Sequence, residues 1–180
     1  MQYRHSTNGS IDTPKKILKV NHAGEFGAIN IYRSQLFFSR LFLKDLVPLL
    51  ESFLADEQRH LDIFWQEIQR RNGIKCKSFW LCGLGGYVMG MVSSMLGRRG
   101  IMACTWAVES VVITHLQAQL VFLEGTNDKE AAETVRAIMD DEINHREEGV
   151  LQGGRANIWY QPLRCGISLF TEGVIRFGMR

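Results

Sequence analysis

Apolar residues recur every three or four positions along most of the chain, which is the spacing of one face of an α-helix. No run of alternating β-branched residues competes with this pattern, and it restarts near each of the three prolines. Helices are predicted over about 14–43, 48–71, 101–124, from 127 or 128 to 149 or 153, and from 157 to the terminus. The chain is therefore predicted to be all-α.

The stretch at 78–97, SFWLCGLGGYVMGMVSSMLG, carries no charged side chain and lies between Lys77 and the pair Arg98-Arg99. Its length suits a transmembrane helix, but five glycines keep its hydrophobicity modest. Three interpretations stay open: a membrane span, a buried helix of the protein interior, and a segment lying in the membrane interface through its Trp80 side. The interfacial segment is favoured because it also suits an apolar substrate that arrives from the bilayer.

Length and composition narrow the class of protein. The 180 residues are a typical single-domain length, and the segment 1–13 is expected to be a flexible N-terminus. A net charge of +2, with basic residues clustered only in pairs, argues against nucleic acid as a partner. The four cysteines have no C-x-x-C spacing, so we expect free thiols in a reducing compartment. The N-terminus has no apolar export signal, which favours the cytoplasm or its membrane.

The order Asp-Glu-x-x-His occurs twice, as DEQRH at 56–60 and as DEINH at 141–145. Residues three apart lie side by side on a helix, so Glu57 pairs with His60 and Glu142 with His145. One such pair is weak evidence, but two of only five histidines have it, which chance explains poorly. The faces around both pairs are largely apolar, and a cation would satisfy a carboxylate and an imidazole that face inward.

Two further glutamates complete a repeated layout. Glu25 lies 32 residues before Glu57, and Glu109 lies 33 residues before Glu142. Taken alone, each of these glutamates could equally well be a half-exposed charge on the surface of a helix. Together with the two pairs they match a four-helix bundle in which one Glu from each of two helices and Glu-x-x-His from each of two others hold two iron or manganese ions. Because no candidate ligand is a cysteine, iron is favoured over zinc, with manganese as a lesser alternative.

Four other residues are predicted to lie beside the metals without binding them. Asp56 is expected to accept a hydrogen bond from the outer N–H of His145, and Asp141 one from the outer N–H of His60. It is equally consistent with the sequence that both aspartates are exposed residues of acidic helical turns. Tyr32 shares a helix face with Glu25, and it is either near the metals or, as is commoner, a tyrosine of the protein core. His115 lies about 120° around its helix from Glu109 and is a supporting residue at best.

These residues resemble the demethoxyubiquinone hydroxylase family of ubiquinone biosynthesis, a membrane-associated branch of the ferritin-like di-iron carboxylate proteins. The resemblance covers about residues 14–178. The motifs that carry it are NHAGEFGAINIY at 21–32, DEQRHL at 56–61, the glycine-rich apolar segment, ACTWAVES at 103–110 and DDEINHREEG at 140–149.

The resemblance implies a single domain at 14–180, an all-α ferritin-like four-helix bundle with a di-iron site and additional apolar, membrane-interfacial helices. It implies a monooxygenase that hydroxylates the ring of a demethoxyubiquinol, 2-polyprenyl-3-methyl-6-methoxy-1,4-benzoquinol. Dioxygen is the implied co-substrate, and a reduced nicotinamide or the quinol itself is the implied electron donor. The implied metal-binding and catalytic residues, with two Fe ions per chain, are Glu25, Glu57, His60, Glu109, Glu142 and His145.

The implied location is the cytoplasmic side of a bacterial inner membrane, as a peripheral membrane protein. The implied partners are the prenylated quinol, the membrane surface, and a ubiquinone-biosynthesis complex or a lipid-presenting accessory protein. This chain departs from the family by having Phe26 and Leu116 where tyrosines are common, which makes the electron donor less secure. The alternatives are another ferritin-like di-iron oxidase or hydroxylase, and an iron-handling protein.

Overall fold

The computed structural model describes residues 13–153 and 156–178, and all regular structure within these ranges is helical. The prediction of an all-α protein is confirmed. Apart from Thr13, the N-terminal segment predicted to be flexible lies outside the described residues. The elements are α1 (Pro14–Phe42), the 3₁₀ helix η1 (Lys44–Leu46), α2 (Val47–Arg70), α3 (Phe79–Met95), α4 (Gly97–Thr126), α5 (Lys129–Gly153) and α6 (Tyr160–Gly178).

Local sequence explains where several helices begin and end. Thr13 caps α1 by accepting a hydrogen bond from the Lys16 amide at 3.3 Å, with proline at the first helical position. Asn72 follows α2 with a left-handed φ of 50°, and Asn127 ends α4 with a φ of 57°. Asp128 then caps α5 by accepting from the Ala131 amide at 3.1 Å. The start of α1, the end of α2 and the start of α5 agree with the predicted ranges to within about two residues.

Three predicted helix starts and ends differ. α4 begins at Gly97 rather than near 101, because the turn after α3 is made at Gly97 itself, whose φ of 67° favours glycine. α4 also runs through Gly125 and ends at Thr126. α6 begins at Tyr160 rather than 157, because the Asn157 side chain accepts from the Trp159 amide and holds a turn before the helix.

Gly149 was one of two predicted ends of α5, but the helix passes through it and reaches the other, Gly153. A Cβ at position 149 would lie 2.8 Å from the backbone nitrogen of Trp106 and 3.1 Å from the carbonyl oxygen of Met102. Glycine is therefore required here by the close crossing of α4 and α5, and not by a helix end.

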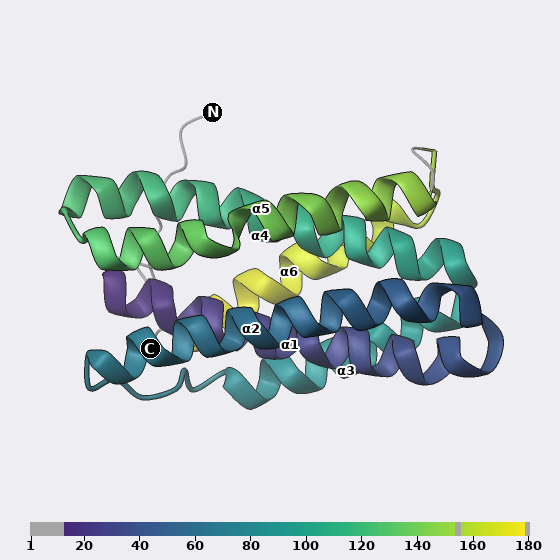
Figure 1. The fold of residues 1–180 in the computed structure, drawn as a ribbon, viewed down its shortest axis with the longest axis horizontal. Coiled ribbons are helices and arrows are strands. Elements are labelled where there is room, and N and C mark those ends of the chain that lie inside the picture. Colours follow the sequence, from purple (N-terminus) through teal and green to yellow (C-terminus); the bar gives the residue numbers. More distant parts are fainter. Residues whose placement is uncertain (1–12, 154–155, 179–180) are drawn as a thin grey trace.

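Two antiparallel helix pairs form the bundle (Figure 1). α1 packs on α2, α4 packs on α5, and the two pairs face one another, with α2 against α5. α3 lies along the outside of α1, and α6 crosses behind the bundle against α4 (Figure 1). Four helices thus enclose the interior, and two cover it from outside.

The bundle interior has two apolar clusters, one on each side of its midpoint along the helix axes. One cluster contains Leu18, Phe64, Leu116 and Ile138. The other contains Tyr32, Leu50, Phe53 and Met102. All four bundle helices contribute to these clusters, so the polar residues placed between them are held by packing on both sides.

α3 packs on α1 through its glycines. A Cβ on Gly86 would lie 2.0 Å from the carbonyl oxygen of Gly27, and one on Gly90 would lie 2.4 Å from that of Ile31. The opposite face of α3 is apolar and open, with Trp80 73% exposed. Other exposed apolar residues of this face are Leu81, Leu84, Val88, Val92 and Met95.

Among the described residues, α4 is the one helix long and apolar enough to cross a membrane by length and composition. Its most apolar window is 44% buried inside the protein, and the helix supplies Glu109 to the interior. α3 is shorter, at 17 residues. These features make α4 a core helix of the bundle and leave α3 as the apolar helix on its outside.

One end of the bundle is closed by a charged network. Arg71 donates two hydrogen bonds to Asp128, at 2.6 and 2.7 Å, and a third to Glu67 at 2.5 Å. The hydrogen bonds from Arg70, together with that from Arg71, lower the pKa of Glu67 although its burial acts in the opposite direction. The bonds from Arg71 likewise lower the pKa of Asp128. Arg71 thereby ties the C-terminus of α2 to the N-terminus of α5.

We expect Arg71→Gln to lower the free energy of unfolding by about 2 kcal/mol at pH 7, because it leaves the partly buried Asp128 without its arginine and Glu67 with Arg70 alone. Both carboxylate pKa values are lowered by folding, so this contribution is present above about pH 4 and is lost as the pH falls through the folded values. Urea denaturation at pH 7 and at about pH 3 measures it. Arg40→Gln, which removes an exposed pair with Glu51, is the control and should change stability little at either pH.

Candidate metal centre

The six predicted ligands meet in the middle of the bundle. Their donor atoms fall into two groups in which all atoms lie within 4.8 Å of one another. Glu57 and Glu142 belong to both groups. The first group is Glu25, Glu57, His60 and Glu142, and the second is Glu57, Glu109, Glu142 and His145.

Each bundle helix supplies its part through helical spacing. α1 and α4 give one glutamate each, and α2 and α5 give one Glu-x-x-His pair each. All six side chains are at most 5% exposed. The apolar neighbours of these pairs on α2 and α5 are buried as well: Phe53, Phe64, Val135 and Ile138.

The inner donor atoms of this cluster are not satisfied by the protein. Nδ1 of His60 and of His145, Oε1 of Glu57 and both carboxylate oxygens of Glu142 are buried without a hydrogen-bond partner. Nδ1 of His60 lies 3.0 Å from Glu142 Oε1, and Nδ1 of His145 lies 3.4 Å from Glu57 Oε1. Buried polar atoms are rarely left unpaired, so an oxygen- and nitrogen-binding cation fits this donor set.

Electrostatics support the same conclusion. Burial, followed by the charge of neighbouring glutamates, raises the pKa of Glu25, Glu109 and Glu142 well above the usual value. Four carboxyl groups in one dry space repel one another when ionised. Two divalent cations would offset this charge, since each carboxylate then faces a positive ion.

The outer ring nitrogens of both histidines face aspartates on the opposite helix. Nε2 of His60 lies 3.1 Å from Asp141 Oδ2, and Nε2 of His145 lies 3.2 Å from Asp56 Oδ2. Both pairings predicted from the sequence are present. An imidazole that donates its Nε2–H outward keeps the Nδ1 lone pair free to face inward, which is how a histidine ligand is oriented.

Tyr32 lies beside the site, as expected. Its hydroxyl donates a hydrogen bond to Glu109 Oε1 at 2.8 Å, and burial, then the charge of Glu109, raises the pKa of Tyr32 well above its usual value. Tyr32 therefore holds one glutamate of the second group in place.

Within residues 13–153 and 156–178, two further histidines, His22 and His115, lie apart from both donor groups. His22 is stacked between Trp65 and Phe79, with ring centroids 5.2 and 5.0 Å away, and burial lowers its pKa to about 4. His115 lines a pocket beside the site, and burial lowers its pKa as well. Both imidazoles are neutral at pH 7.

The pocket is the main feature that the sequence did not reveal. It has a volume of about 140 Å³ and extends between α1, α3, α4 and α6 to four of the metal-site glutamates. Its walls are mainly apolar, with Asn21, His115, Gln119 and Thr171 as polar exceptions. Asn21 and Gln119 bind each other through two amide hydrogen bonds, of 2.7 and 3.0 Å. No motif predicts this space, because α3 and α6 form much of its wall by packing from outside.

The two departures from the family pattern lie in apolar surroundings. Phe26 stacks on Phe79, with ring centroids 4.2 Å apart, and meets Trp80 edge-on. Leu116 is 1% exposed within the cluster that contains Leu18 and Phe64. Each side chain serves packing at its position.

A four-helix bundle with a glutamate from each of two helices and Glu-x-x-His from each of two others belongs to the ferritin-like di-iron carboxylate class. Within that class the particular family follows from comparison with known proteins. The model of the family described as "Ubiquinone biosynthesis protein COQ7" matches residues 12–178. The chain belongs to this family.

Individual relatives agree with the family match. The chain is 32% identical over 168 residues, 92% of its length and 76% of the relative, to "NADPH-dependent 3-demethoxyubiquinone 3-hydroxylase, mitochondrial" of Dictyostelium discoideum. It is 30% identical over 164 residues, 89% of its length and 87% of the relative, to the protein of the same name in Caenorhabditis elegans. It is also 30% identical over 140 residues, 78% of its length and 65% of the relative, to "3-demethoxyubiquinol 3-hydroxylase" of Rhodospirillum rubrum.

Proposed function

We propose that this chain is a di-iron monooxygenase that hydroxylates the ring of a demethoxyubiquinol in ubiquinone biosynthesis. The observation that carries the proposal is the apolar pocket that ends on Glu25, Glu57, Glu109 and Glu142. An iron-storing or purely structural bundle has no need of an apolar space that leads to its metal ligands.

The reaction inserts one atom of dioxygen into a ring C–H bond and reduces the other atom to water, with two electrons and two protons. Two iron ions held by the six ligands would supply the activation of dioxygen. The protein itself holds the quinol ring at the ligands and excludes water through the apolar walls of the pocket.

Polar groups in the pocket are suited to the quinol head group. The neutral imidazole of His115 can accept a hydrogen bond from a ring hydroxyl, because its lowered pKa leaves it uncharged at pH 7. The paired amides of Asn21 and Gln119 hold each other fixed, and each keeps further hydrogen-bonding capacity. A small number of fixed polar groups in an apolar pocket orients a ligand.

We place the protein at a membrane surface, where its prenylated substrate resides, with α3 in the interface. The exposed apolar residues of α3 support this location, as does Leu169 of α6, which is 71% exposed. Gly85, Gly86 and Met89 of α3 also line the pocket, so the tail of the quinol would leave the site toward the same surface. Several relatives are named as NADPH-dependent, and we propose a reduced nicotinamide as the electron source.

The test is anaerobic loading of the full chain with Fe²⁺, followed by oxygen, a reductant and demethoxyubiquinol, with mass spectrometry of the quinone. The expected product is heavier by one oxygen atom and carries ¹⁸O when ¹⁸O₂ is used. If about two iron ions bind per chain but no oxygen is transferred to any prenylated quinol, the result would support the metal site and contradict the proposed substrate.

Ile167→Trp should block the pocket. Ile167 is a buried residue of α6 that lines this space, and the larger side chain would displace the quinol ring from the ligands. We expect kcat/KM for the quinol to fall about 100-fold, because small misplacements of a reacting ring are costly. Steady-state kinetics measure this, and iron content should stay unchanged. Arg164→Trp, at an exposed position of the same helix that does not line the pocket, is the control, and an equal loss there would contradict the assignment of the pocket.

A further inference from the structure

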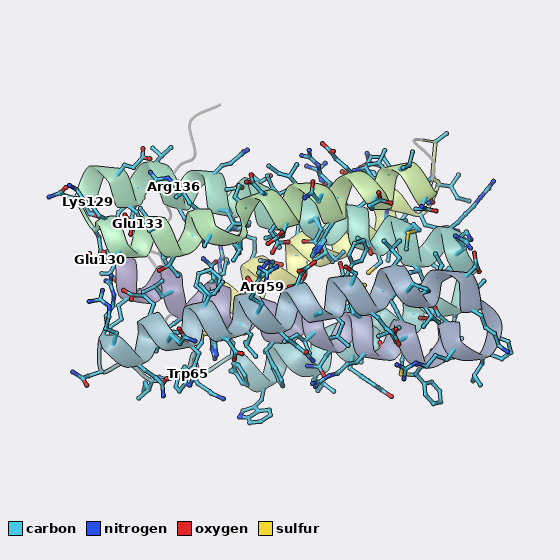
Figure 2. The ribbon with its side chains drawn as sticks, viewed as in Figure 1. Arg59, Trp65, Lys129, Glu130, Glu133 and Arg136 are labelled. Carbon is cyan, nitrogen blue, oxygen red and sulfur yellow. The ribbon has the colours of Figure 1, made fainter. Side chains whose placement is uncertain are left out.

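Arg59 lies between the two aspartates that hold the histidines. It sits on α2, next to His60 in the chain, and Figure 2 labels it near the middle of the bundle. Its Nη2 lies 2.5 Å from Asp56 Oδ1 on the same helix. Its Nη1 and Nη2 both lie 3.2 Å from Asp141 Oδ2 on α5. One guanidinium therefore contacts the carboxylates of both helices.

Each aspartate contacts both the arginine and one of the two histidines. Asp56 faces Arg59 with Oδ1 and His145 with Oδ2. Asp141 uses Oδ2 for both Arg59 and His60. The contacts form a continuous path from one imidazole to the other: His145, Asp56, Arg59, Asp141 and His60.

Arginine suits this position for physical reasons. A guanidinium is planar and always charged, and its five N–H donors lie in a fixed geometry, so it can bind two carboxylates at once in fixed directions. Without it, two aspartates would face each other over the metal ligands with nothing to offset their repulsion. A free carboxylate rotates, and the imidazole that donates to it then loses its fixed plane.

We infer, on the basis of the metal site in the proposed function, that Arg59 is a positioning residue that fixes both metal-binding imidazoles through Asp56 and Asp141. It contacts neither metal nor quinol. Because the two aspartates serve different histidines, one in each donor group, the loss of Arg59 should weaken both cation sites together.

An exposed ion pair commonly contributes little, and Arg59 is 47% exposed. The affinity for a metal ion distinguishes the two roles, because a simple surface ion pair would leave it unchanged and a positioning residue would not. We would titrate the metal-free full chain with Co²⁺ under anaerobic conditions and follow the visible ligand-field absorption. Arg59→Gln should weaken both binding steps about tenfold and change the cobalt spectrum, since outer partners of ligands tune metal affinity by such factors. The thermal midpoint of the metal-free protein should stay close to that of the parent.

Proton spectra of the cobalt protein give a direct readout of the imidazoles. Each histidine ligand contributes one shifted, solvent-exchangeable N–H resonance, from His60 and from His145. In Arg59→Gln both resonances should exchange faster with water, because the carboxylates that hold them are free to move. Asp56→Asn should affect mainly the His145 resonance, and Asp141→Asn mainly that of His60.

Two further variants complete the test. Arg59→Lys keeps the charge without the planar geometry and should restore part of the affinity. Arg136→Gln removes an exposed arginine that pairs with Glu124, and it should leave cobalt binding unchanged. Parent-like affinity and spectra in Arg59→Gln would overturn the inference, as would the loss of only one site. These measurements do not depend on quinol hydroxylation, so the inference about Arg59 can hold even if the proposed substrate is wrong.

Discussion

Glu142→Leu should yield a folded protein that no longer hydroxylates the quinol, and this protein should be more stable than the parent when both are free of metal. Glu142 belongs to both donor groups, so its loss removes one candidate ligand from each group. A bound metal contributes several kcal/mol to transition-state stabilisation, which corresponds to a loss of about 1,000-fold or more in kcat/KM.

The gain in stability has a separate cause. Both carboxylate oxygens of Glu142 are buried without a partner, and burial, followed by the charge of Glu57, raises its pKa well above the usual value. An apolar side chain of similar size at this position removes a desolvated acid from the core. We expect an increase of about 1–3 kcal/mol in the free energy of unfolding of the metal-free protein.

Calorimetry of the metal-free proteins, iron analysis and the oxygen-transfer assay measure these effects. Glu147→Leu is the matched control, because Glu147 lies on the same helix with an exposed side chain. It should keep full activity and iron content. A Glu142→Leu protein that retains two irons, or that is less stable without metal than the parent, would contradict the proposal that Glu142 is a buried ligand shared by both donor groups.

Gly86→Ala should separate α3 from α1. The added Cβ would lie 2.0 Å from the carbonyl oxygen of Gly27, a backbone atom that cannot turn aside. We expect the free energy of unfolding to fall by about 3 kcal/mol, at the upper end of the usual range for overpacking. Both glycines also line the pocket, so the KM for the quinol should rise while iron binding stays intact.

Urea denaturation and steady-state kinetics test this prediction. Gly125→Ala is the control, because Gly125 is helical and its added Cβ would meet nothing within 4 Å. Alanine there should be neutral or stabilising by up to about 1 kcal/mol. Equal stability of the two variants would show that the approach of α3 to α1 is not required.

Helical spacing made much of the site predictable. Glu57 with His60, and Glu142 with His145, share a face wherever a helix forms, and the matching offsets of Glu25 and Glu109 extended the pattern to four helices. The aspartate pairings could be predicted because the two halves repeat one layout. Arg59 gave no such signal, since an arginine within an acidic helical turn suits a solvated surface equally well.

Close backbone approaches were harder to predict. Gly149 looked like a helix end, but it marks the crossing of α4 and α5, and a sequence alone does not distinguish these uses of glycine. The glycines of α3 had the same ambiguity. The pocket depends on where α3 and α6 pack, which is set by contacts far apart in the chain.

The crossed aspartate pairs have a consequence for the order of assembly during synthesis. Each donor group takes ligands from both helix pairs, and each aspartate serves the histidine of the other pair. The first pair, made of α1 and α2, leaves the ribosome with three acidic or imidazole ligands but without a complete group. Neither donor group is therefore complete until α5 has been made and docked against α2. A cation that needs all four donors of a group can bind only to the assembled bundle.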